Sequence, residues 1–164
     1  GDFGKILGAD CYSPHTVEPT HPDFGFYGIH GVETLYTLLG TGCEAVSRIH
    51  SPMGDIVSGR WNDGRLGTFR AVVKGPAVYG GTAFTEKGTV AAGGYAGYKV
   101  LLDEILRYFK SGASPVSKEE TLEIFTFMKA SNMSLERGGR TVMMDEAYAE
   151  GMKEARRLLE AYDE

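Results

Sequence analysis

The fold is decided by the stretch EAVSRIHSPMGDIVSGRWNDGRLGTFRAVVK, residues 44–74. It holds three short β-like runs, at residues 44–50, 55–61 and 66–74, separated by turn-forming Ser-Pro-Met-Gly (51–54) and Asn-Asp-Gly (62–64). Two further runs of this kind follow at residues 77–85 and 89–92. Connections this short join antiparallel neighbours, whereas a parallel pair needs a crossover of about a dozen residues or more. The sequence therefore predicts consecutive antiparallel hairpins.

Helical periodicity lies on both sides of these hairpins. Residues 27–39 predict a helix that ends at Gly40, and residues 5–12 predict a strand before a loop at 13–23. Three more helices are expected at residues 98–110, from Ser117 to Gly138-Gly139, and from about Asp145. Ser117 and Glu120 have the spacing of a capping box, which marks the start of the second of these three helices.

The expected inner faces of these helices are apolar residues at helical spacing. They are Ile29, Val32, Leu35, Tyr36 and Leu39; Leu102, Ile105, Leu106 and Phe109; Leu122, Phe125, Met128 and Leu135; and Tyr148, Met152, Ala155, Leu159 and Tyr162. Strands followed by helices predict an α+β fold, an open, mostly antiparallel sheet with helices packed on one face. We expect a single domain over residues 1–164, with 145–164 as an extra C-terminal helix and no Rossmann domain.

Length and charge argue against several classes of protein. At 164 residues the chain is too short for a complete two-domain nicotinamide dehydrogenase. A net charge of −5 argues against nucleic acid and anionic membranes as partners, because both require a basic surface. No apolar run approaches the roughly 18 residues of a membrane span. The chain begins without methionine or a signal-like region, which leaves the compartment open, with the cytoplasm as the default and export as the alternative.

Glycine is unusually frequent, with 23 residues, and one glycine-rich segment invites a nucleotide-binding interpretation. Gly40-Thr-Gly-Cys-Glu-Ala45 matches the dinucleotide fingerprint G-x-G-x-x-A, but it follows a predicted helix and precedes a predicted strand. A pyrophosphate site needs the reverse order. We therefore expect a helix end and a turn, and no cofactor-binding residue in this chain. Cys11 and Cys43 form no CxxC pair and are expected to be buried thiols.

A polar face on the helix predicted at residues 27–39 is the candidate for acid–base chemistry. His30 and Glu33 lie one turn apart on it, followed by Thr34 and Thr37. A carboxylate beside a histidine fixes the tautomer of the imidazole and favours its protonation. The alternative interpretation is a solvated helix face. A metal site is not expected, because no second ligand pair has the spacing to complete one.

The loop before this helix concentrates aromatic and hydrogen-bonding side chains. They are Tyr12, His15, Glu18, His21, Asp23 and Tyr27. Such a set is typical of a sugar or polyol pocket, and an ordinary surface loop can have the same composition. Trp61, beside the turn at residues 62–64, is expected to pack at a strand end. No G-x-S-x-G, HExxH or P-loop motif supports a hydrolase or kinase function.

Several segments occur in a familiar order. They are Tyr27-Gly-Ile-His-Gly-Val-Glu33; Leu39-Gly-Thr-Gly-Cys43; Gly59-Arg-Trp-Asn-Asp-Gly-Arg65 with Gly67-Thr-Phe-Arg70; and Pro115-Val-Ser-Lys-Glu-Glu-Thr121 through Gly138-Gly-Arg140. Together they resemble the C-terminal half of the glucose–fructose oxidoreductase/inositol dehydrogenase (Gfo/Idh/MocA) family, over about residues 5–144. The resemblance implies a substrate-binding α+β domain whose open sheet forms a homo-oligomer interface. It also implies a separate N-terminal Rossmann domain that binds NAD or NADP and is missing here.

The resemblance assigns roles to individual residues. Gly28-Ile-His30 matches the family's Gly-x-His segment, which implies that His30 is the acid/base residue at the substrate, and Glu33 matches the acidic residue three positions later. The substrate-binding residues that we expect are Tyr12, His15, Tyr27 and Glu33. The implied reaction is hydride transfer between a sugar or cyclitol carbon and nicotinamide. Without the nucleotide-binding half, the chain is expected to bind no cofactor and to be inactive alone.

The sequence departs from the family pattern at Phe26. Many members have an aspartate at this position, four residues before the histidine, so the departure weakens the transfer of a detailed proton relay. The family's catalytic lysine lies in a Glu-Lys-Pro segment of the missing half, and Glu86-Lys-Gly88 is a hairpin turn without the proline. Phe26 favours an alternative function, a non-catalytic sugar-binding or assembly module with the same fold.

Overall fold

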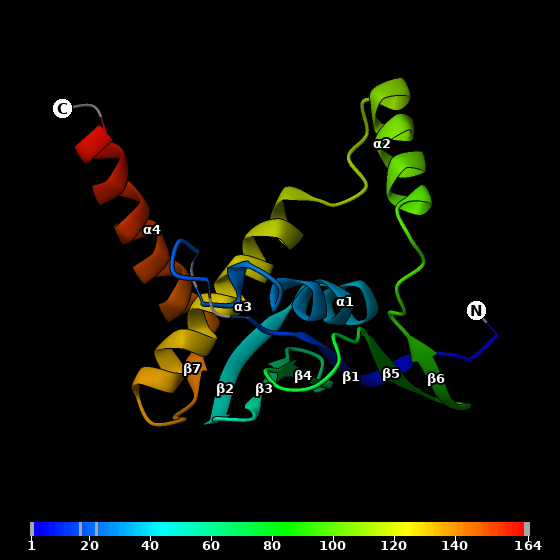
Figure 1. Cartoon of the computed structure of the whole chain (residues 1–164), viewed down its shortest axis with the longest axis horizontal. Coiled ribbons are helices and arrows are strands. Elements are labelled where there is room, and N and C mark those ends of the chain that lie inside the picture. Colours follow the sequence, from blue (N-terminus) through cyan, green and yellow to red (C-terminus); the bar gives the residue numbers. More distant parts are fainter. Residues whose placement is uncertain (1, 17, 22, 163–164) are drawn as a thin grey trace.

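The computed structural model describes residues 2–16, 18–21 and 23–162. The elements in these ranges follow one another as β1 (Ile6–Pro14), the 3-10 helix η1 (Asp23–Gly25), α1 (Ile29–Leu39), β2 (Cys43–Ser51), β3 (Gly54–Trp61), β4 (Leu66–Val72), β5 (Gly80–Thr85), β6 (Gly88–Ala92), α2 (Lys99–Ser111), α3 (Lys118–Glu136), β7 (Val142–Met143) and α4 (Met144–Tyr162) (Figure 1). Val17 and Pro22 of the predicted loop, and residues 163–164 of the predicted last helix, lie outside the described residues.

The strands of the described ranges form one open sheet in the order β6-β5-β1-β4-β3-β2-β7. The hairpins β2–β3, β3–β4 and β5–β6 are antiparallel, as predicted. The prediction of uninterrupted hairpins is wrong at one place, because β1 lies between β4 and β5, parallel to β4 and antiparallel to β5. Residues 73–79 therefore form no hairpin turn. They carry the chain past β1, across two strand spacings of about 4.8 Å each.

One face of the sheet forms the core under α1. On β1 the buried residues Ala9, Cys11 and Ser13 point to this face and alternate with residues that point to the other one. Gly31 lets α1 approach closely, because an added Cβ there would overlap the ring of the buried Phe69. The predicted stripe of α1 is buried at Val32, Leu35, Tyr36 and Leu39, and partly buried at Ile29.

The second helix on this face is α3, and the side that it buries agrees with the prediction only in part, because Met128 is buried and Leu135 is half-buried. Its start is as predicted, because the Ser117 hydroxyl accepts a hydrogen bond from the Glu120 N–H at 3.0 Å. Leu122 and Phe125 are exposed and line a groove beside α4, so their placement on the inner face was wrong. The residues of α3 that face the core are Ile124, Phe127, Met128, Ala130, Ser131, Met133 and Ser134. The sequence carries two apolar stripes on this helix, and only packing selects between them.

The remaining helices depart further from the prediction that helices pack on the sheet. Figure 1 shows α2 standing away from the sheet, and none of its residues is buried, so the predicted inner face from Leu102 to Phe109 is exposed. The start of α4 packs against α3 and buries Met144 and Ala147. The stripe predicted for α4 is exposed at Tyr148, Met152, Ala155, Leu159 and Tyr162. The spacing of apolar residues predicts that a helix has an apolar face, but it does not predict which part of the protein packs against that face.

Candidate functional site

The start of α1 is held by β1. Gly28, at the N-cap position, has no side chain to cap the helix. Instead the Ser13 hydroxyl lies 3.2 Å from the carbonyl oxygen of Tyr27 and 3.4 Å from that of Gly28. A Cβ at Gly28 would lie 2.9 Å from Cδ1 of the buried Phe24, so glycine is required there by packing. Ser13 and Phe24 thereby determine where Tyr27 and the first turn of α1 lie.

His30 and Glu33 form the predicted pair on the outer face of α1. Nδ1 of His30 lies 3.0 Å from Oε2 of Glu33, and each side chain is 50% exposed. Because a carboxylate only accepts hydrogen bonds, the pairing makes Nδ1 the donor and leaves Nε2 of His30 to accept a proton. The geometry is that of a histidine whose tautomer is fixed for general-base chemistry.

An open pocket of about 670 Å³ lies in front of this pair. Its side walls come from α1, the end of β6 and the segment between β6 and α2. The lining residues are Tyr27, His30, Glu33, Thr34, Thr37, Leu38, Tyr79, Ala92, Gly93, Gly94, Tyr95, Ala96 and Tyr98. A groove of about 1080 Å³ along α4 is larger, but no histidine is among its lining residues, which are Lys129 and nine residues between positions 148 and 160. The smaller pocket is the better candidate because it combines aromatic walls with the His30–Glu33 pair.

Three tyrosines of this pocket were not predicted from the sequence. The Tyr79 ring lies 6.0 Å from the His30 ring, and the Tyr95 and Tyr98 rings lie 6.0 Å apart at 82° to each other. Desolvation and neighbouring phenols raise the pKa of Tyr79 and of Tyr95, so both hydroxyls stay protonated near neutral pH. For Tyr95 and Tyr98 the available signal was the segment Gly93-Gly-Tyr-Ala-Gly-Tyr98, with aromatic residues between glycines.

The structure brings only part of the predicted site together. Tyr27 lies in the pocket beside His30, with ring centroids 6.3 Å apart, and Glu33 lies there too. Tyr12 is not among the lining residues: it alternates with Cys11 and Ser13, so it points to the opposite face of the sheet. His15 is not among them either, since it is 4% exposed and its Nε2 lies 3.2 Å from Oδ1 of Asp23.

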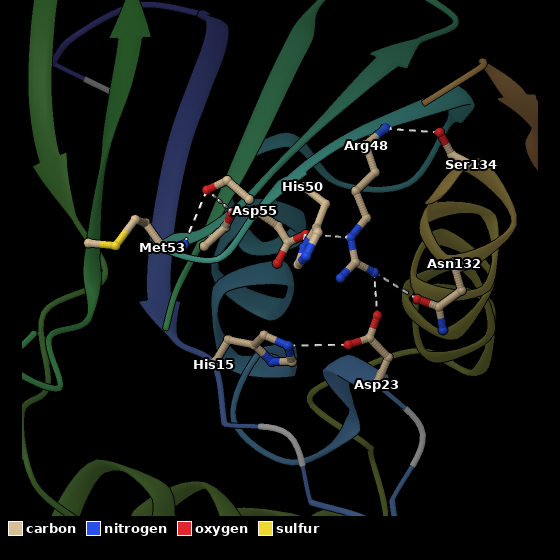
Figure 2. Close-up of polar contacts among 10 residues, drawn as sticks. His15, Asp23, Arg48, His50, Met53, Asp55, Asn132 and Ser134 are labelled. Atoms are coloured by element: carbon tan, nitrogen blue, oxygen red, sulfur yellow. Dashed lines mark hydrogen bonds and ion pairs between the residues drawn. The ribbon is translucent and has the colours of Figure 1, made fainter. Parts of the chain in front are cut away.

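Asp23 and His15 belong to a separate polar cluster around the buried Arg48 (Figure 2). The Nε–H group of Arg48 donates a hydrogen bond to Oδ1 of Asp55 at 2.9 Å. Its Nη1 group donates to Oδ1 of Asn132 at 3.0 Å and also to the carboxylate of Asp23. Its central carbon also lies 4.2 Å above the ring of Phe24. The cluster thus ties the loop before α1 to β2, β3 and α3.

The pKa of Asp23 is lower than its ordinary value in this cluster. Burial alone would raise it, but hydrogen bonds from His15 and Arg48 together with the charge of Arg48 outweigh burial and lower it. Asp23 is therefore ionised at neutral pH. His50 contributes from the edge, where its Nδ1 lies 2.8 Å from Oδ1 of Asp55.

The fingerprint-like segment 40–45 is a helix end and a turn, as interpreted. α1 ends at Leu39, and Gly40 has a positive φ of 68°. The N–H groups of Gly42 and Cys43 donate to the carboxylate of Glu123, with the shortest contact of each at 2.8 Å. A carboxylate therefore occupies the donors that a pyrophosphate would use, and the segment does not fit a dinucleotide. Trp61 packs at the strand end, as expected, and its Nε1 donates to the Gly40 carbonyl at 2.9 Å.

The two cysteines, the possible metal ligands and the lengths of the helices complete the description of the chain. Cys11 and Cys43 are buried thiols, as expected, and burial raises the pKa of each to about 12. In the described ranges no group of His, Cys, Asp or Glu side chains is arranged to hold a metal ion. Within those same ranges, every helix is too short or too polar to cross a membrane.

Comparison with known proteins shows which solved structures have a similar fold. No protein-family model and no curated protein sequence matches the chain. Among solved structures, myo-inositol 2-dehydrogenase from Lactobacillus plantarum matches with a TM-score of 0.70 at 13% identity, over 87% of this chain and 58% of that chain. Myo-inositol dehydrogenase from Lactobacillus casei, solved with NAD(H) and myo-inositol, gives a TM-score of 0.65 at 12% identity, over 86% and 54%.

A third solved structure extends the range of similar proteins. The WlbA dehydrogenase from Bordetella pertussis, solved with NADH and UDP-GlcNAcA, matches with a TM-score of 0.63 at 18% identity, over 86% of this chain and 55% of that chain. The chain thus spans little more than half the length of these dehydrogenases. At such low identity the likeness establishes the fold. The α+β domain expected from the resemblance to the Gfo/Idh/MocA family is confirmed.

Proposed function

We propose that this chain is the substrate-binding domain of an NAD- or NADP-dependent oxidoreductase of the Gfo/Idh/MocA family that oxidises a CH–OH group of a sugar or cyclitol. The observation that carries the proposal is the His30–Glu33 pair in a pocket walled by tyrosines. Similar solved proteins bound to NAD(H) or NADH, together with myo-inositol in one case and UDP-GlcNAcA in another, support the class of reaction.

The reaction divides between this chain and a nucleotide-binding domain outside it. The bound nicotinamide would accept the hydride from the ring carbon, and the segment at 40–45 does not fit that cofactor. Nε2 of His30 takes the proton from the substrate hydroxyl while the carbonyl forms. The carboxylate of Glu33, 3.0 Å from Nδ1, stabilises the imidazolium that results.

The test uses this chain together with its nucleotide-binding half. His30→Ala should lower kcat/KM at least tenfold, about 1.4 kcal/mol of transition-state stabilisation. His21→Ala is the matched control, because His21 is exposed and does not line the pocket. Turnover by His30→Ala equal to that of the unchanged protein would remove the catalytic role from His30.

Phe26 supports a second candidate, a non-catalytic sugar-binding or assembly module. Its ring lies 4.6 Å from the Tyr27 ring, at 80°, and offers no carboxylate for a relay behind His30. The reading frame upstream of Gly1 separates the two candidates. A strand–GxGxxG–helix unit within about 120–200 residues supports the oxidoreductase, and a signal peptide followed directly by this domain supports the module.

We also propose that the sheet face turned away from α1 and α3 joins copies of this chain into a homo-oligomer. Strand alternation directs Ile49, Leu66 and Phe84 to this face, and they are 71%, 62% and 40% exposed. A sheet face with this much exposed apolar surface is typical of an interface.

A further inference from the structure

We propose that the pocket in front of His30 selects ring substrates that carry an ammonium group over rings that carry a carboxylate or phosphate. The inference rests on the proposed function, because it names the substrate class of the same site. Two independent features of the described lining residues carry it: their formal charge and the four tyrosine rings among them.

The charge of the pocket favours a cation. Glu33 supplies the only carboxylate among the described lining residues, and none of them is Lys or Arg. Lys99, which directly follows Tyr98, directs its Nζ to Asp103 at 2.6 Å. A carboxylate or phosphate on the substrate would therefore meet Glu33 without a counter-charge, whereas an ammonium group would be attracted to it.

The tyrosine rings supply the second feature. The Tyr95 and Tyr98 rings stand nearly perpendicular to each other, and the Tyr27 and Tyr79 rings lie 6.3 Å and 6.0 Å from the His30 ring. An organic ammonium group is attracted to the negative face of an aromatic ring, and four of the described lining residues are tyrosines. The raised pKa of Tyr79 and Tyr95 keeps both phenols neutral and able to donate a hydrogen bond. A polyol ring can thus present a hydroxyl to His30 and an amino group to the tyrosines.

The experiment titrates this chain at pH 7 with four matched probes: D-glucosamine, D-glucose, D-glucuronate and D-glucose 6-phosphate. NMR signals of the His30 and tyrosine rings report binding at the pocket. We expect D-glucosamine to bind about two- to fivefold more tightly than D-glucose, the usual worth of an exposed cation–π contact, and both anions to bind more weakly than D-glucose.

Variants then separate charge from aromatic contact. Glu33→Gln should reduce the penalty against the two anions. Tyr98→Leu should remove the preference for D-glucosamine, and Tyr98→Phe should retain it, because the ring face is kept. Tyr162→Leu is the control, since Tyr162 is 90% exposed on α4, outside the pocket.

The outcomes distinguish the two proposals. If all four probes perturb the His30 signals and the anions bind as tightly as D-glucosamine, the selectivity is refuted and the substrate-binding role stands. If no probe perturbs His30 at concentrations near saturation for a weak sugar site, the substrate-binding role fails, and the selectivity fails with it.

Discussion

Arg48 and Asp55 lie on adjacent strands, with Nε of the guanidinium 2.9 Å from Oδ1 of the carboxylate, and both side chains are almost completely buried, at 3% and 2% exposure. Asp23, Asn132 and the Phe24 ring surround the rest of the guanidinium. A buried cation with this many partners holds charges that would be costly if left alone. The residues of this cluster therefore matter for stability and for the position of the loop before α1.

Arg48→Leu should destabilise the fold by about 3–5 kcal/mol, because it leaves the carboxylates of Asp23 and Asp55 without their cation. Urea unfolding monitored by Trp61 fluorescence measures the loss. The control is Arg60→Leu. The Arg60 guanidinium reaches Glu44 at 3.6 Å with both side chains about half exposed, and such pairs contribute about 0–1 kcal/mol. Equal losses in the two variants would contradict the role given to the buried cluster.

The lowered pKa of Asp23 predicts a pH dependence of stability. The folded-state pKa lies below the ordinary value of 3.8, so ionised Asp23 stabilises the fold above about pH 4, and this contribution is lost as the pH falls through the folded-state pKa. The difference in unfolding free energy between the unchanged protein and Asp23→Asn should be largest at pH 5–7. It should shrink as the pH approaches 3. A difference that stays constant from pH 7 to pH 3 would show that Asp23 does not titrate in this way.

Two glycines in helices should respond oppositely to the same substitution. Gly31→Ala should destabilise by about 1–3 kcal/mol, because the new methyl group would overlap the Phe69 ring and lie 2.9 Å from the Ser13 hydroxyl. Gly151→Ala should stabilise by about 0.5–1 kcal/mol, because it lies within α4 and a Cβ there meets nothing within 4 Å. Thermal unfolding of both variants gives the signs. A neutral Gly31→Ala would mean that α1 can lift from the sheet at little cost.

The proposed sheet-face interface predicts which surface leucine controls association. Leu66→Glu should convert an oligomer to a monomer in light scattering, because it replaces an exposed apolar side chain of the proposed interface with a charge. Leu159→Glu should not, although Leu159 on α4 is exposed to nearly the same extent, 66% against 62% for Leu66. A chain that is strictly monomeric at high concentration before any substitution would count against the interface.

The elements that the sequence predicted correctly depend on neighbours along the chain. The turns at residues 51–54 and 62–64 join antiparallel strands, Gly40 ends α1, and Ser117 caps α3. Each of these features involves residues within a few positions of one another, so propensity and hydrogen bonding specify them locally. The His30–Glu33 pair is of the same kind, since one helical turn brings the two side chains together.

What the sequence could not determine involves residues that are far apart in the chain. The insertion of β1 between β4 and β5, the choice between two stripes on α3 and the exposure of α2 depend on which surfaces meet in three dimensions. The same holds for His15, which the sequence suggested as a substrate ligand and which packs beside Asp23. The sequence could not predict the pocket either, because Tyr27 and Tyr79, which lie about fifty residues apart in the chain, both approach His30.

The sequence alone therefore determined the α+β class, the hairpins and a histidine–carboxylate pair, because short-range geometry produces them in any tertiary context. The tertiary structure decided which polar residues join a buried charged cluster and which line an open pocket. Burial is the physical reason: it paired His15 and Asp23 with Arg48 in the interior, and left His30 half exposed among tyrosines where a substrate can reach it.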